Sequence, residues 1–351
     1  MKRLIGPVLT FLLLSSSSLG AHAFCGFYVS GGGADIYNNA TQVVLMRDGT
    51  RTILSMQNNY EGPPEDFAMV IPVPVVLMEA NVKTLDKSLF AKVDQLSAPR
   101  LVEYWETDPC QPSQYENNGG CSDCNNDGNN AGVVVEAEFK VGEYQIVILS
   151  AEDSGGLTSW LTGNDYNIPE DAQEHLQPYV ENGEYFFVAK VIPEEVIFED
   201  GRAVLSPLRF DYDASQFNLP IRLGLISAED QQDLLIYVLA KGQRYHAANY
   251  NNAFIPTNVG VVDAVREDFG SFYNALFSRV QENEPNTVVT EYSWSASNCD
   301  PCPPGGVLEA SDLATLGADV LGEDAALDST WVLTRLHARY DAGNVGEDIV
   351  F

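Results

Sequence analysis

Residues 41–76 read TQVVLMRDGTRTILSMQNNYEGPPEDFAMVIPVPVV, and this stretch decides the expected fold. Two apolar runs, residues 42–47 and 50–58, flank the dipeptide Asp48-Gly49, which accepts the positive φ angles of a type I′ hairpin turn. A third apolar run, residues 67–71, ends at two prolines, which lack the amide hydrogen that a strand ladder needs. We therefore predict a hairpin with a third strand that returns beside it as a meander.

The rest of the chain mixes strand-like and helical patterns. Apolar residues recur at helical spacing in residues 85–96 and 263–284, and we expect the aromatic stripe of the second helix to lie in the core. Residues 154–182 are helical in pattern, with interruptions at Gly163 and Pro178. Further strands are expected at residues 133–139, 143–150, 185–192, 203–212, 221–226, 233–239, 244–249, 287–294 and 331–340. This order predicts an α+β fold of mostly antiparallel sheets with a few packed helices, braced by disulfides.

The N-terminus has the pattern of a secretory signal peptide over residues 1–23. Two basic residues precede an apolar run at residues 4–14, and Ala21-His22-Ala23 offers the small residues of a cleavage site. The apolar run is too short for a membrane span, which needs about 20 residues. We therefore expect export to the periplasm, the cell surface or the extracellular space, with no transmembrane span after processing.

The mature chain, residues 24–351, is expected to form one exported domain. Its composition also permits two subdomains, residues 24–106 and 133–351, separated by an insertion rich in Cys, Asn and Gly at residues 107–132. Removal of two basic residues with the leader leaves 17 basic against 50 acidic side chains, a net charge of −33. Such a charge disfavours nucleic acid and anionic lipid as partners, because both need basic patches.

Six cysteines remain after cleavage, and an even number in an oxidising compartment predicts three disulfides with unknown pairing. They are Cys25, Cys110, Cys121, Cys124, Cys299 and Cys302. The pair Cys299-Asp300-Pro301-Cys302 has the spacing of thiol-disulfide oxidoreductases, but Pro-Pro-Gly-Gly follows it and leaves no helix start to lower a thiol pKa. A structural disulfide is the favoured interpretation, and redox chemistry is the alternative.

One segment resembles half of a calcium loop. Asp123, Asn125 and Asp127 supply oxygen atoms at alternate positions before a glycine, but Val134 stands where the loop needs its bidentate carboxylate. The alternative is a flexible insertion tethered by cysteines. The histidines of the mature chain, His175, His246 and His337, are isolated from one another, and we expect His246 to be half-buried on a strand. No metal-binding or nucleophile motif occurs, so the sequence identifies no catalytic residue and no cofactor.

Several strings resemble domain of unknown function family 2330, a group of exported bacterial proteins. They are Phe24-Cys25-Gly26-Phe27-Tyr28-Val29, residues 39–59, residues 64–75, residues 198–201 with 206–210, and Cys299-Asp300-Pro301-Cys302. The resemblance covers nearly the whole mature chain, and it implies no activity and no catalytic residue.

Our leading hypothesis is a non-enzymatic protein of the cell envelope or extracellular space. It would act as a binding or structural component on an envelope or extracellular protein or ligand. The alternative is a secreted enzyme, with a thiol-disulfide oxidoreductase that uses Cys299 and Cys302 as the most testable form.

Overall fold

The structure is a computed structural model. It describes residues 27–30, 37–38, 42–57, 60–61, 67–102, 135–164, 172–199, 202–227, 232–256, 260–340 and 346–351. The predicted signal peptide, Cys25, Cys110, Cys121, Cys124 and the calcium candidates Asp123, Asn125 and Asp127 lie outside these residues. The predictions for them, and the division into subdomains, stay predictions.

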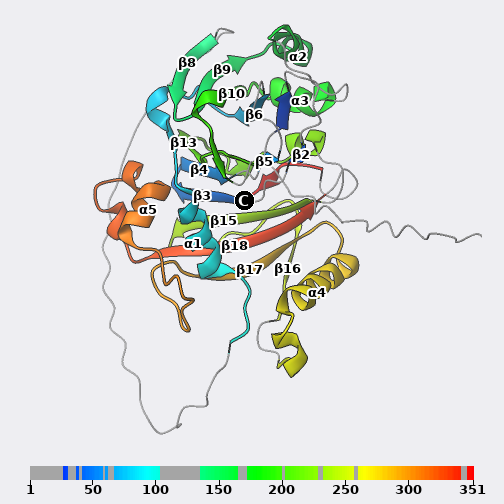
Figure 1. Ribbon diagram of the computed structural model, residues 1–351, viewed down its shortest axis with the longest axis vertical. Helices are drawn as coiled ribbons and strands as arrows, with labels where there is room; N and C mark the ends of the chain where they lie inside the picture. The colour runs from blue at the N-terminus through cyan, green and yellow to red at the C-terminus, as the bar shows by residue number, and fades with distance from the viewer. Residues whose placement is uncertain are drawn as a thin grey trace, which may run out of the picture.

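Two stacked β-sheets form the body of the protein (Figure 1). The larger sheet has the order β16-β17-β18-β15-β3-β4-β13-β7, and the smaller has the order β1-β6-β10-β9-β8. The neighbouring strands of both are antiparallel except in the pairs β15/β3 and β16/β17. Together with the packed helices, these sheets confirm the predicted α+β class.

The strands of the two sheets have the following bounds. The larger sheet contains β3 (Gln42–Asp48), β4 (Arg51–Gln57), β7 (Val82–Thr84), β13 (Leu208–Asp213), β15 (Gln232–Lys241), β16 (Asn251–Phe254), β17 (Thr287–Ser295) and β18 (Trp331–Tyr340). The smaller contains β1 (Phe27–Ser30), β6 (Phe67–Val73), β8 (Val135–Val141), β9 (Tyr144–Ser150) and β10 (Tyr185–Val191). Short ribbons pair β2 (Tyr37–Asn38) with β5 (Tyr60–Glu61), β11 (Ile197–Glu199) with β12 (Arg202–Val204), and β14 (Asn218–Leu219) with β19 (Ile349–Val350).

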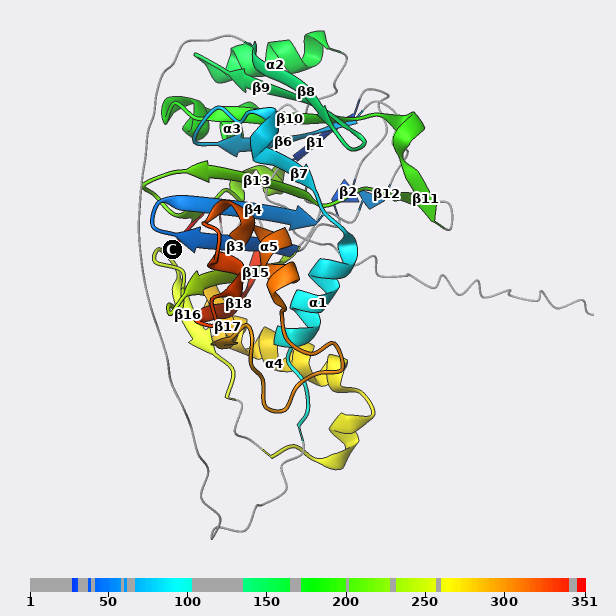
Figure 2. The same ribbon diagram turned by 90° about the vertical axis from the view of Figure 1, so that its left-hand side faces the viewer.

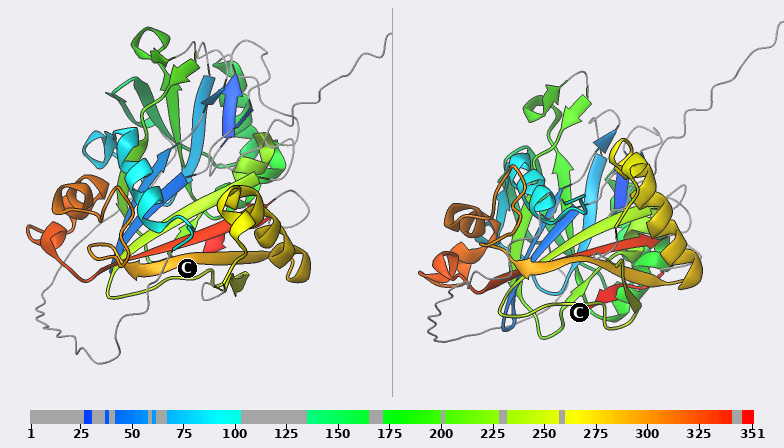
Figure 3. Two further views of the ribbon diagram at one scale, coloured as in Figure 1. Left: turned by 60° about the horizontal axis from the view of Figure 1, so that its bottom comes forward. Right: turned by 90° about the horizontal axis from the view of Figure 1, so that it is seen from below.

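Helices lie on the two outer faces of this sandwich (Figure 2). The bounds are α1 (Lys87–Ser97), α2 (Ser154–Gly163), α3 (Ala172–Glu181), α4 (Phe269–Asn283) and α5 (Ala310–Leu316). The pair α2 and α3 covers the smaller sheet, while α1 and α5 cover the larger one. A view from below shows α4 beside β17, at the end of the larger sheet opposite β7 (Figure 3).

The main core fills the space between the sheets. Alternate residues of one strand serve different layers, as period-2 side-chain alternation requires. On β15, Ile236 and Val238 face the smaller sheet, whereas Tyr237 and Leu239 face α1 and α5. The central strands of the larger sheet are therefore apolar on both faces, which explains the continuous apolar runs in the sequence.

The predicted hairpin is present, with its turn one residue later than expected. Asp48 pairs with Arg51, so the two loop residues are Gly49 and Thr50. Only Gly49 of these has a positive φ, +58°. A β-branched threonine resists positive φ, so one glycine at the first loop position favours a II′-like geometry over type I′.

The meander prediction is wrong. The third apolar run becomes β6, which leaves the hairpin and enters the smaller sheet between β1 and β10. The position beside β4 is taken by β13, from more than 150 residues later in the chain. Pro72 lies within β6 opposite Phe186 and does not end it, because the strand continues to Val73.

Several other expectations differ from the structure. The strand expected at residues 221–226 is instead a 3₁₀ segment, η3 (Arg222–Ser227), and residues 244–249 form no strand. Pro178 lies inside α3 and does not interrupt it. The second predicted helix divides into η4 (Asp263–Arg266) and α4, and Phe277 is the buried residue of α4. The other aromatic residues of α4, Phe269, Phe272 and Tyr273, are half-exposed, because this helix lies at the end of the sheet.

Candidate functional site

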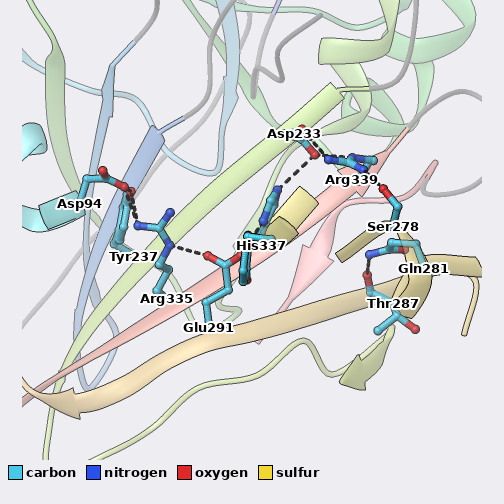
Figure 4. A network of polar contacts seen from close by, with 11 residues as sticks. Asp94, Asp233, Tyr237, Ser278, Gln281, Thr287, Glu291, Arg335, His337 and Arg339 are labelled. Carbon is cyan, nitrogen blue, oxygen red and sulfur yellow. Dashed lines mark hydrogen bonds and ion pairs between the residues drawn. The ribbon is translucent and has the colours of Figure 1, made fainter. Parts of the chain in front are cut away.

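A cluster of charged side chains lies on the outer face of the larger sheet, between α1 and α4 (Figure 4). Arg335, His337 and Arg339 are alternate residues of β18, so all three point to the same face. Asp233 and Tyr237 come from β15, Glu291 from β17 and Asp94 from α1. We call these seven residues the His337 cluster.

His337 lies at the centre of the cluster, between two carboxylates. Its Nδ1 is 2.7 Å from Oε1 of Glu291, and its Nε2 is 3.1 Å from Oδ1 of Asp233. Glu291 is the extra residue of a β-bulge between Thr290 and Tyr292, and a bulge redirects a side chain away from the regular pleat. The irregularity in β17 thus positions the buried carboxylate beside the imidazole.

Arg335 extends the cluster toward α1. Its Nε donates to Oε2 of Glu291 at 2.6 Å, and its Nη1 donates to Oδ1 of Asp94 at 2.5 Å. The guanidinium also lies 5.4 Å from the ring centroid of Tyr237, whose hydroxyl donates to Asp94 at 2.7 Å. The side chains of Arg335 and Glu291 are 7% and 1% exposed, so this ion pair is buried.

Helix α4 covers the other end of the cluster. The Phe277 ring stacks on the His337 imidazole with centroids 4.0 Å apart, and the Arg339 guanidinium lies 4.8 Å from the Phe277 centroid. Arg339 binds both oxygen atoms of Asp233, at 2.6 and 3.0 Å, and donates to Oγ of Ser278 at 3.2 Å. The Phe277 ring therefore lies between two basic side chains.

The surroundings shift the pKa values of the ionisable groups. Burial alone would lower the pKa of His337, but its hydrogen bonds to Asp233 and Glu291 outweigh burial, so the pKa is raised. Burial alone would raise the pKa values of Asp233 and Glu291. Hydrogen bonds from His337 and Arg339 outweigh burial at Asp233, and a hydrogen bond from His337 with the Arg335 charge outweighs it at Glu291. Both pKa values are therefore lowered to about 2. The cluster therefore contains an imidazolium between two carboxylates at mildly acidic pH.

The arrangement around His337 is closed. Both ring nitrogens of His337 have partners, and Phe277 covers one ring face. Two cavities, of about 530 and 330 Å³, lie elsewhere and contain none of the cluster residues. Within the described parts of the chain, no three His, Cys, Asp or Glu residues are placed to hold a metal ion. The cluster connects three strands of the larger sheet to α1 and α4.

Cys299 and Cys302 form a disulfide, with Cα atoms 4.9 Å apart. Cys299 packs against the core beneath α1 and α5, whereas Cys302 is exposed. Arg100 donates to the carbonyl oxygen of Pro301 at 2.9 Å, which attaches this loop to the end of α1. No helix begins at the pair, because α5 starts only at Ala310.

Sequence reasoning missed the His337 cluster. The three histidines of the mature chain are far apart in the sequence, and His246 is exposed in a loop instead of half-buried on a strand. The available signal was Arg335-Leu336-His337-Ala338-Arg339, where period-2 alternation places three basic groups on one face. Their acidic partners come from three distant segments, so the pattern could not identify them.

One known protein family matches nearly the whole chain. The model of a family described as an uncharacterised protein conserved in bacteria, domain of unknown function 2330, matches residues 19–351. The chain belongs to this family. The predicted resemblance is thus confirmed. No curated protein and no solved structure matches the chain. Within the described residues, no helix has both the length and the apolar character required to cross a bilayer.

Proposed function

We propose that this member of family 2330 is exported and acts as a binding or structural component of the cell envelope or extracellular space, not as an enzyme. The observation that supports a non-enzymatic role most strongly is the closure of the His337 cluster. Catalytic groups with shifted pKa values normally face a cleft where a substrate can reach them. Here His337 and Arg335 pair with Glu291, Asp233 and Asp94 on the face of the sheet between α1 and α4.

The disulfide supports a bracing role. A reactive cysteine needs an environment that stabilises its thiolate, such as the N-terminus of a helix. Cys299 and Cys302 lie in an irregular loop that the bond closes, and the nearest following helix begins eight residues after Cys302. The oxidised pair is also the state expected after export to an oxidising compartment.

The test expresses the complete chain in a bacterium and measures the intact mass of the protein recovered outside the cytoplasm. We expect a mature protein that begins at Phe24 and carries the disulfide between Cys299 and Cys302. The purified protein should not catalyse insulin reduction by dithiothreitol. The double substitution Cys299→Ser and Cys302→Ser should lower the melting temperature.

Two results would overturn the proposal. One is a cytoplasmic protein that retains Met1 and has free thiols at both positions. The other is insulin reduction at a catalytic rate that disappears in the double-serine variant, which would establish the oxidoreductase alternative.

A further inference from the structure

A cavity of about 330 Å³ lies where the two sheets meet at the end of β6. Pro72 and Pro74 line it from the smaller sheet, Phe210 and Tyr212 from β13, and Glu184 from the residue before β10. Its volume is at the lower end of the roughly 300–1,000 Å³ of small-molecule sites. The walls are mixed: apolar side chains such as Leu54 and Phe210 lie beside polar ones such as Glu184, Tyr212 and Gln216.

Two of these polar groups have no partner. Tyr212 is 6% exposed, yet among the described residues neither its hydroxyl nor the carboxyl of Glu184 makes a hydrogen bond. Glu184 is half-buried, and neither oxygen is among the fully buried polar atoms without a partner, so both are open to the cavity. Both groups line the same cavity, so a ligand that enters it can supply the partners that they lack.

The neighbouring carboxylates are already occupied. Asp213 binds Arg51 at 2.7 Å and the Thr50 hydroxyl at 3.3 Å. Asp348 accepts from the Tyr179 hydroxyl at 2.6 Å and from the backbone amide of Ile221 at 3.0 Å. Glu184 therefore offers the cavity a single carboxyl that is free to pair, which suits a monovalent cation better than a divalent metal.

The electrostatics favour a cation. Burial and the nearby Asp348 charge raise the pKa of Glu184 to about 7. Burial also raises the pKa of Tyr212; the nearby Arg47 charge acts against this rise and Glu184 adds to it. The Arg47 guanidinium is itself bound to Thr52 and to the carbonyl oxygens of Thr50 and Ala214. Burial and the Asp348 charge disfavour the ionised form of Glu184, and a positively charged ligand beside it would stabilise that form.

We propose that the Glu184–Tyr212 cavity binds a small organic ammonium ion, with its nitrogen on the Glu184 carboxylate and the Tyr212 oxygen. Its carbon chain would lie against Pro72, Pro74 and the Phe210 ring. An ammonium group supplies donors for both unpartnered oxygens and can lie near an aromatic face. This inference rests on the proposed function, since it assigns a ligand to a protein that binds without chemistry.

The test is calorimetric titration of the mature, disulfide-bonded protein with n-butylammonium at pH 8. The matched probes are 1-butanol and butyrate, which keep the chain and change the charge. We expect butylammonium alone to bind, and its affinity to fall about tenfold between pH 8 and pH 6, as Glu184 takes up a proton. Asp348, Tyr179 and Tyr212 also lie near Glu184; burial raises the pKa values of both tyrosines, so their hydroxyls stay protonated across this range.

Three variants isolate the site. Glu184→Gln should weaken binding by at least about tenfold, and Tyr212→Phe by about threefold to tenfold, through loss of one hydrogen bond. Glu174→Gln removes the same charge from an exposed position on α3 and should leave the affinity unchanged. Equal binding of 1-butanol, no binding of butylammonium at millimolar concentration, or full affinity in Glu184→Gln would overturn this inference.

The outcome also separates this inference from the proposed function. NMR of the mixture after long incubation should recover butylammonium unchanged. If the amine binds through Glu184 but is chemically altered, the site stands and the non-enzymatic proposal fails. If butylammonium does not bind, this inference fails and the non-enzymatic proposal stands.

Discussion

The buried charge of a single residue, His337, is stabilised by the two carboxylates beside it. An isolated imidazolium would be costly to bury, but Glu291 and Asp233 each accept one of its ring hydrogens. Glu291 in turn binds Arg335, so its two oxygens serve two different cations. Removal of this single carboxylate would leave two buried positive charges next to each other.

Glu291→Gln should therefore be strongly destabilising. Breaking a buried ion pair by removal of one partner costs about 3–5 kcal/mol, because the other charge stays buried and unpaired. Chemical denaturation at pH 6 measures the loss in the free energy of unfolding. Glu282→Gln is the control, because Glu282 and Arg279 form an exposed pair on α4 that contributes at most about 1 kcal/mol. Equal losses in the two variants would contradict the buried arrangement.

At the scale of elements, α4 depends on a small number of contacts. Phe277 is its buried side chain, and the Tyr273 hydroxyl donates to Oε1 of Glu291 at 2.5 Å. Gln281 adds a hydrogen bond to the Thr287 carbonyl oxygen at 2.9 Å. A helix with so little buried apolar surface can open without unfolding of the rest of the protein.

Phe277→Ala should release α4 locally. Truncation of a buried phenylalanine costs about 3–5 kcal/mol, and here the cost falls on one helix. We expect trypsin to cleave after the exposed Arg279 at least about tenfold faster, with a smaller change in global melting. Phe272→Ala removes a half-exposed ring from the same helix and should leave the cleavage rate almost unchanged. Equal cleavage rates in both variants would show that Phe277 does not anchor α4.

Local patterns predicted individual elements well but not their partners. Helical spacing after Asp86 located α1, because Asp86 caps the helix and Leu89 and Val93 then face the core. The destination of β6 was not predictable, since its apolar residues fit either sheet equally well. The same limit applies to the site: the basic residues share one strand, whereas Asp94 and Glu291 reach them only through the packing of distant segments.

At the scale of the whole molecule, α1, α4 and three strands of the larger sheet meet at the His337 cluster. This junction should make stability depend on pH in a specific direction. The pKa of His337 is raised in the folded state, so its contribution is fully present below its unfolded value of 6.5. It is lost as the pH rises through the folded value. Asp233 and Glu291 have lowered pKa values, so their contributions are lost only as the pH falls from about 4 toward 2.

The most direct test of this account compares the free energy of unfolding of the wild-type protein and His337→Gln between pH 5 and pH 9. Glutamine keeps a hydrogen-bonding side chain and removes the charge. We predict that the wild type is more stable by the widest margin near pH 5–6, and that the margin shrinks as the pH rises through the raised pKa of His337. A margin that stays constant, or that widens with pH, would contradict a protonated His337 that holds α4 to the sheet.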